Sequence, residues 1–157
     1  MSYTCIYIHY VWSTKYRKPI LVQPFRQKLF DHIRQNALVK DIYIDRINGF
    51  FDHIHCLICL HPNQSIDKVA QLLKGESSYW FNQQKDMGNH KLYWQDQYFA
   101  VSVSLSMVLK TRAYIDNQES YHQKKTFEEE YALFLKKYLK IKTLENSGEI
   151  FKINTVR

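Results

Sequence analysis

His53 and His55 are the residues of this sequence whose type and spacing best suit metal chemistry. They begin an apolar stretch, residues 53–60, whose composition favours a β-strand. Because residues two apart in a strand point to the same face, both imidazoles can reach one divalent ion. This pair is therefore a candidate metal site, although two partly buried strand histidines without a ligand would show the same pattern.

The same stretch carries Cys56 and Cys59, spaced as in a zinc-binding pair. A zinc knuckle needs a turn between its cysteines, and Leu57 and Ile58 are not turn-forming residues. The sequence also has no second Cys-x-x-Cys pair. In a strand the two thiols point to opposite faces, so we expect no structural zinc and place Cys56 in the core.

A second group of residues with chemical potential lies near residue 116. Tyr114 and Gln118 are four positions apart, so a helix would present them on one face. A tyrosine near a metal can act as a nucleophile, and a glutamine oxygen can complete the shell of an ion. His122 lies four positions further along and could support both. Taken singly, each residue is more often ordinary packing or solvated surface.

The elements that must position these residues follow the order βαββαβ. Strands are expected over residues 4–12, 42–48, 53–60 and 98–104, with strict alternation of faces through residues 42–48. Helical spacing follows Pro24 and Ser65, and Ser65 can cap the helix that it precedes. A further helix from about Leu105 to His122 would carry the tyrosine. This order predicts a ferredoxin-like α+β fold, an antiparallel sheet with helices on one face and one added helix.

Composition narrows the class of protein. The chain has 157 residues, 45% of them hydrophobic, which fits one domain with a packed core. Its net charge of +7 indicates an acidic partner, most commonly nucleic acid, and its 12 tyrosines could stack on unpaired bases. No apolar run is long enough for a membrane helix, and no signal peptide precedes the first strand. Three cysteines in such a chain predict a reduced, cytoplasmic protein.

Five segments in order carry a family resemblance. They are VWSTKYR at 11–17, DHIHCL at 52–57, LKGESS at 73–78, WQDQY at 94–98 and YIDNQ at 114–118. With them the chain resembles the single-tyrosine transposases of the insertion-sequence 200/605 type, within the HUH endonuclease superfamily. The resemblance covers roughly residues 1–135, which predicts a transposase domain there and a tail over residues 136–157. From Thr126 the sequence is amphipathic at first and then polar, so we expect one more short helix followed by a loose end.

The resemblance implies roles for the residues singled out above. His53, His55 and Gln118 would bind Mg²⁺ or Mn²⁺, and Tyr114 would be the nucleophile that forms a 5′-phosphotyrosine bond with single-stranded DNA. It also implies recognition of DNA hairpins and a homodimer in which the tyrosine helix serves the histidine pair of the partner subunit. Candidate DNA contacts are Lys15, Arg17, Lys18 and Lys74, and His122 is a candidate supporting residue.

Three other functions are compatible with parts of this pattern. One is an HUH nuclease of the replication or conjugation type, against which the short chain and single tyrosine argue. Another is a domesticated hairpin-binding protein that no longer cuts DNA. The last is a ferredoxin-like RNA-binding module, which would need exposed aromatic residues on its central strands.

Overall fold

A computed structural model of the chain describes residues 1–87 and 89–145, without the side chains of Met87 and residues 138–145. The chain divides into two compact units, Met1–Tyr121 and His122–Arg157. The family resemblance placed a boundary after residue 135 instead, and that boundary remains a prediction. No helix in the described ranges is long and apolar enough to cross a membrane.

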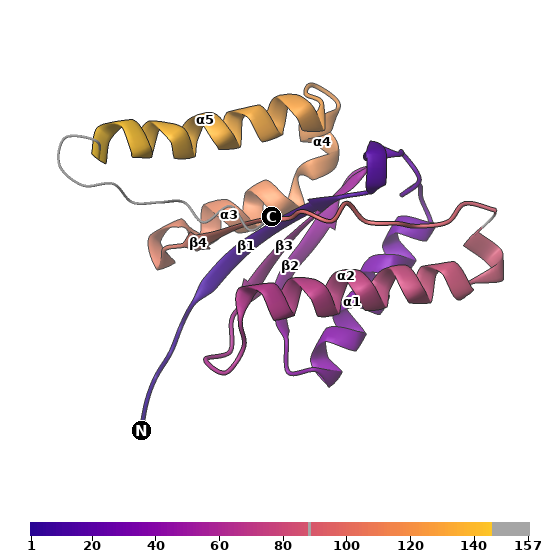
Figure 1. Ribbon diagram of the computed structural model, residues 1–157, viewed down its shortest axis with the longest axis horizontal. Helices are drawn as coiled ribbons and strands as arrows, with labels where there is room; N and C mark the ends of the chain where they lie inside the picture. The colour runs from indigo at the N-terminus through magenta and orange to yellow at the C-terminus, as the bar shows by residue number, and fades with distance from the viewer. Residues whose placement is uncertain (88, 146–157) are drawn as a thin grey trace. The chain divides into compact units, whose positions relative to one another are not determined.

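The first unit is built on a sheet of four antiparallel strands in the order β2-β3-β1-β4 (Figure 1). The strands are β1 (Tyr7–Ser13), β2 (Tyr43–Gly49), β3 (His53–Cys59) and β4 (Phe99–Val103). This order is that of the ferredoxin-like fold, which confirms the predicted class. β3 and β1 occupy the centre of the sheet, so the histidines lie on a strand with hydrogen-bonded neighbours on both sides.

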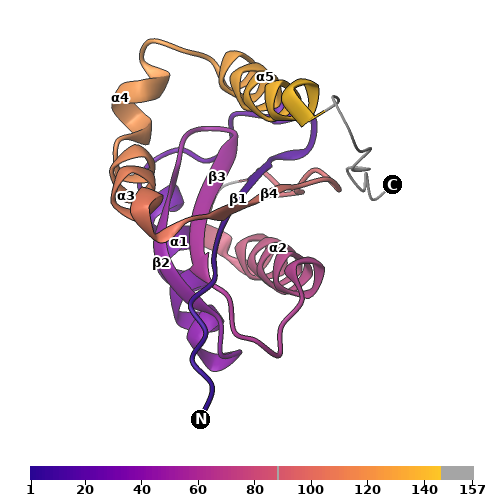
Figure 2. The ribbon, with the colours of Figure 1, turned by 90° about the vertical axis from the view of Figure 1, so that its left-hand side faces the viewer.

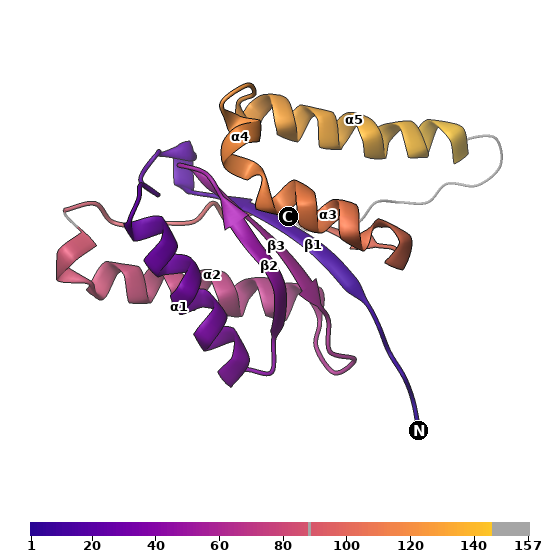
Figure 3. The ribbon, with the colours of Figure 1, turned by 180° about the vertical axis from the view of Figure 1, so that it is seen from behind.

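Helices α1 (Phe25–Val39) and α2 (Ile66–Gln83) cover one face of the sheet, and α3 (Val108–Asp116) covers the other (Figure 2). α3 contacts β2 and β3. The view from behind shows it on the opposite side of the sheet from α1 and α2 (Figure 3). The predicted cap of α2 is present, because the Ser65 hydroxyl accepts a hydrogen bond from the Lys68 backbone N–H at 3.1 Å.

The main core lies between the sheet and the pair α1 and α2. It contains the even-numbered residues of β1 and β3, with Tyr10, Trp12 and Cys56 all at most 1% exposed. Cys56 is therefore a core residue, as predicted, and all three cysteines of the chain are free thiols. The odd-numbered residues of the same strands point to the other face, toward α3, and these include both histidines of the pair.

Alternation through β2 differs from the prediction at Asp45. The register against β3 shifts between Ile44 and Arg46, so Asp45 is an extra residue in the strand. Ile44 and Ile47 consequently both pack against the main core, although their spacing predicted opposite faces. The shift turns Asp45 toward α3, where it contacts Arg112.

The expected helix over residues 105–122 is interrupted. A short 3₁₀ turn at Leu105–Met107 precedes α3, and Asn117 separates α3 from α4 (Gln118–His122). Asn117 has φ −98° and ψ 19°, outside the helical range, while its N–H still bonds to Ala113 O at 3.1 Å. Asparagine tolerates such conformations.

The second unit contains α5 (Phe127–Glu145), which is longer than the short helix expected there. Its start is stabilised by reciprocal hydrogen bonds between Thr126 and Glu129, from Glu129 N to Thr126 Oγ1 at 3.2 Å and from Thr126 N to Glu129 Oε2 at 2.7 Å. The predicted loose end beyond residue 145 lies outside the described residues.

Candidate metal and tyrosine site

His53 and His55 lie side by side on β3, under α3. Both are fully buried, and their ring centroids are 5.1 Å apart with the planes nearly perpendicular. Burial of two imidazoles is costly unless their nitrogens find partners. The partners come from three separate segments of the first unit.

His53 has an oxygen atom at each ring nitrogen. Its Nδ1 lies 2.7 Å from Asp52 Oδ1, and its Nε2 lies 3.2 Å from Gln118 Oε1. The Gln118 amide nitrogen donates to Tyr114 O at 3.4 Å, which orients the amide oxygen toward His53.

This geometry fits a divalent cation. A neutral imidazole carries one N–H and can donate to only one of the two oxygens. With the proton on Nδ1 and bonded to Asp52, the lone pair of His53 Nε2 faces that of Gln118 Oε1. A cation bound by both atoms satisfies these lone pairs, and a carboxylate behind a metal-binding histidine is the usual arrangement. Two imidazoles and an amide oxygen leave coordination positions for a substrate.

His55 is bonded to a third histidine, His9 of β1. His9 Nε2 lies 2.9 Å from His55 Nδ1, and their ring centroids are 5.2 Å apart. His9 is 5% exposed, and burial followed by the nearby His55 lowers the pKa of His9 well below its usual range. His9 is therefore a neutral imidazole with a lone pair available to a neighbour.

Tyr114 packs edge-on against this cluster. Its ring centroid is 5.6 Å from that of His55, at 85°, and 6.2 Å from that of His9. The side chain is half-buried, and its ring centroid also lies 5.5 Å from that of Tyr121. The candidate nucleophile and the candidate metal ligands therefore meet within one chain.

Polar contacts to β2 fix α3 in this position. Arg112 donates from Nη2 to Asp45 Oδ2 at 2.7 Å, and the Asp45 side chain is only 4% exposed. Arg46 bonds to Asp45 Oδ1 at 2.9 Å and to Asp116 Oδ2 at 3.4 Å. Asn48 donates to Ile115 O at 2.9 Å. These contacts lie before and after Tyr114 in sequence, so they limit the rotation of the helix that carries it.

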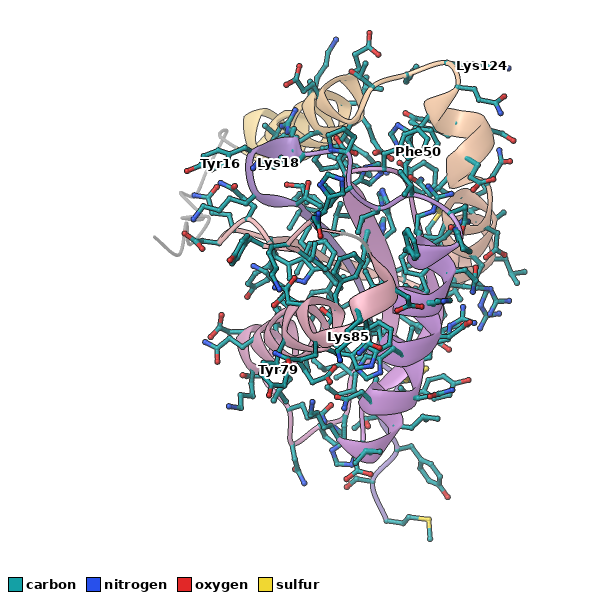
Figure 4. All side chains as sticks on the ribbon, turned by 90° about the vertical axis from the view of Figure 1, so that its right-hand side faces the viewer. Tyr16, Lys18, Phe50, Tyr79, Lys85 and Lys124 are labelled. Atoms are coloured by element: carbon teal, nitrogen blue, oxygen red, sulfur yellow. The ribbon has the colours of Figure 1, made fainter. Side chains whose placement is uncertain are left out.

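Basic residues gather at the turn after β1. Lys15 and Lys18 line a shallow pocket together with Tyr16, Lys91 and Tyr93 (Figure 4 shows Tyr16 and Lys18). Lys15 N donates to Tyr93 O at 2.7 Å, which joins the two segments. The two tyrosines are 79% and 61% exposed, so the pocket combines ammonium groups with accessible aromatic rings.

The other predicted DNA contacts differ from this group. Arg17 is half-buried on the same turn and does not line the pocket. Lys74 on α2 donates to Asp96 O at 2.7 Å and lies over the Tyr98 ring, and burial lowers its pKa. Its ammonium group therefore already has partners within the protein.

His122 belongs to the second unit, where its Nε2 lies 3.0 Å from Glu130 Oε2 and its Nδ1 lies 2.8 Å from Lys125 O. Its predicted role behind the metal ligands remains a prediction.

Several residues of the site were not singled out from the sequence. His9 shares a face of its predicted strand with Val11, but nothing in its spacing indicates a bond to His55. Asp45 and Arg112 meet only because of the register shift in β2. Lys91 and Tyr93 reach the β1 turn through the bridge between Thr14 and Trp94.

The fold and the site together define a class of protein, a ferredoxin-like domain with a histidine pair on a central strand and a tyrosine helix over it. The family model described as "Transposase IS200 like" matches residues 2–118. The chain belongs to this family of DNA transposases, and the match contains the histidine pair, Tyr114 and Gln118.

Individual relatives agree with this assignment. The chain is 27% identical to the ISDra2 transposase TnpA of Deinococcus radiodurans over 114 residues, 70% of this chain and 81% of the relative. A crystal structure described as a transposase from Deinococcus radiodurans R1 superposes with a TM-score of 0.58 at 26% identity, over 74% of this chain and 93% of that one. A REP-associated tyrosine transposase bound to a REP hairpin superposes with a TM-score of 0.57 over 78% of this chain and 72% of that one; at 14% identity it shows the fold alone.

Proposed function

We propose that this transposase cleaves and rejoins single-stranded DNA at hairpin-marked element ends through a covalent bond to Tyr114. The observation that carries the proposal is the contact between the Tyr114 ring and His55, 5.6 Å between centroids, beside a donor set that fits a divalent cation. A nucleophile, two imidazoles and an amide oxygen at one place are what a metal-assisted phosphoryl transfer requires.

In the proposed cleavage step the Tyr114 hydroxyl oxygen attacks the scissile phosphorus. A bond forms between that oxygen and phosphorus as the bond from phosphorus to the 3′ oxygen breaks. The tyrosine proton is lost to solvent and the departing 3′ oxygen takes one up, so the products are a 5′-phosphotyrosine and a free 3′-OH. Rejoining is the reverse attack by a 3′-OH, which needs no nucleotide cofactor because the phosphodiester energy is kept in the tyrosine ester.

The residues of the chain would prepare this step. His53, His55 and Gln118 would hold Mg²⁺ or Mn²⁺, which supplies charge stabilisation at the phosphate when bound. Asp52 fixes the orientation of the His53 ring, and the Asp45–Arg112 contact fixes the helix that carries Tyr114. The half-buried position of Tyr114 limits the access of competing water.

The pocket at the β1 turn is the proposed contact surface for DNA. Its three lysines can neutralise backbone phosphates, and its two exposed tyrosines can stack on unpaired bases. Arg17 and Lys74 remain predicted contacts as well. A hairpin with unpaired bases offers both kinds of group, and a structural relative is bound to a REP hairpin.

The homodimer implied by the family resemblance is part of the proposal. In this chain Tyr114 packs on the histidine pair of its own subunit. Exchange of the tyrosine helix with a partner subunit would require release of the Asp45–Arg112 and Arg46–Asp116 contacts.

The test is cleavage of a labelled single-stranded DNA hairpin, taken from the DNA flanking the gene, with Mn²⁺ or Mg²⁺. The wild-type protein should form a covalent adduct that survives denaturant. Tyr114→Phe should lose the adduct and still bind the hairpin, while Tyr121→Phe, which changes the ring packed against Tyr114, should keep it. An adduct that persists in Tyr114→Phe contradicts the nucleophile assignment, and hairpin binding without any wild-type adduct supports a domesticated binding protein.

A further inference from the structure

His9 approaches the candidate metal site from a strand that contributes none of the proposed ligands. In the register of the sheet His9 pairs with Leu57 and Val11 pairs with His55, so His9 and His55 are diagonal neighbours on one face. The 2.9 Å contact between His9 Nε2 and His55 Nδ1 spans this diagonal. Both rings are at least 95% buried, so bulk water does not compete for it.

The contact restricts the position of both ring protons. If the Nε2 atom of His55 binds an ion, its Nδ1 must carry the ring proton, because a neutral imidazole has one N–H. That N–H then donates to His9 Nε2, which must be the lone-pair nitrogen, so the His9 proton is on Nδ1. His53 follows the same rule, with its Nδ1–H donating to Asp52 Oδ1 at 2.7 Å.

We propose that His9 is a positioning residue for metal binding, which holds His55 in the tautomer and ring orientation that direct Nε2 at the ion. This inference rests on the proposed metal site formed by His53, His55 and Gln118. The two histidines of the pair then have different supports, a carboxylate for His53 and an imidazole for His55.

In this proposal the effect of His9 comes from its hydrogen-bond acceptor atom, Nε2, and not from the volume of its side chain. His9→Phe keeps a flat ring of similar size beside His55 and Tyr114 but offers no acceptor. His9→Gln replaces the ring and can place its amide oxygen near the position of the imidazole Nε2. His32→Phe is a matched control, since His32 on α1 stacks on Trp80 with ring centroids 4.1 Å apart and lies outside the site.

Mn²⁺ binding measured by titration calorimetry without DNA tests the proposal. We expect His9→Phe to bind Mn²⁺ roughly 10–100-fold more weakly than the wild type, the usual effect of losing a partner behind a ligand. His9→Gln should recover most of the affinity, and His32→Phe should bind like the wild type. Wild-type affinity in His9→Phe, or equal losses in the Phe and Gln variants, would overturn the proposal.

A second measurement uses the unmodified protein and therefore does not depend on whether a variant folds. Nitrogen-15 NMR of the imidazole rings in the presence of Mg²⁺ reports which nitrogen carries each proton. We expect His55 and His9 both to be protonated at Nδ1, and a proton on Nε2 of either residue would contradict the inference. Neither experiment measures cleavage, so failure here is distinct from failure of the nucleophile assignment.

Discussion

The side-chain oxygen of Gln118 lies 3.2 Å from Nε2 of His53, although 65 positions separate the two residues. α3 ends at Asp116, Asn117 separates the two helices and α4 begins at Gln118. Tyr114 also lies against the histidine pair, with its ring centroid 5.6 Å from that of His55, and its backbone oxygen accepts a hydrogen bond from the Gln118 amide. The shared face that the spacing of four residues predicted is therefore kept across the break.

Gln118→Ala should weaken Mn²⁺ binding by at least about tenfold, because the proposed third ligand is removed. Gln118→Glu keeps an oxygen at the same reach and adds a negative charge, so it should bind Mn²⁺ as tightly as the wild type or more tightly. Calorimetric titration with Mn²⁺ measures both effects. Gln71→Ala, at an exposed position on α2, is the control, and an unchanged affinity in Gln118→Ala would remove Gln118 from the ligand set.

Gly49 and Gly75 should respond in opposite directions to the same substitution. A Cβ at Gly49 would lie 2.1 Å from the backbone oxygen of His53, whereas a Cβ at Gly75 on α2 meets no atom within 4 Å. Gly49→Ala should lower the free energy of unfolding by about 1–3 kcal/mol and displace the start of β3. Gly75→Ala should raise it by about 0.5–1 kcal/mol, because alanine favours a helix.

Denaturant titration of the two variants gives both free energies. Gly49→Ala should also weaken Mn²⁺ binding, since His53 begins the displaced strand, and Gly75→Ala should not. Equal stability of the two variants would show that the β2–β3 connection can move without cost.

Cys56 should make the protein less stable at alkaline pH. Burial raises the pKa of the Cys56 thiol well above its usual range, so the folded state keeps the proton where the unfolded chain loses it. The unfolded state binds fewer protons above about pH 8.5, and stability therefore falls as pH rises, by up to about 1.4 kcal/mol per pH unit. Below that pH both states keep the proton and stability does not depend on this group.

Cys56→Ala removes the titrating group and leaves every other group in place. The difference in unfolding free energy between wild type and Cys56→Ala should be constant up to about pH 8 and shift by about 1–2 kcal/mol against the wild type by pH 10. Denaturant titrations at several pH values measure it, and a difference that stays constant over the whole range would mean that the thiol ionises normally in the folded protein.

Local patterns were enough to predict most of the fold. Alternating faces identified the strands that contain Tyr10 and His55, and the Ser65 cap identified the start of α2, because these signals depend on neighbours in sequence. Alternation did not predict which residues of β2 face the main core, because β2 has an extra residue at Asp45 and such a register shift depends on the pairing with β3. The helix break at Asn117 was not predicted either, because many asparagines lie inside helices without interrupting them.

The sequence by itself determined which chemical groups are present: a His-x-His pair on a strand, a tyrosine and glutamine four positions apart, and an excess of positive charge. The tertiary structure decided which of them meet. It brought His9 within 2.9 Å of His55, paired Asp45 with Arg112, and joined the segment with Lys91 and Tyr93 to the turn after β1. Each of these contacts joins segments distant in sequence, and such contacts depend on sheet order and register, which the spacing of residues along one chain segment does not encode.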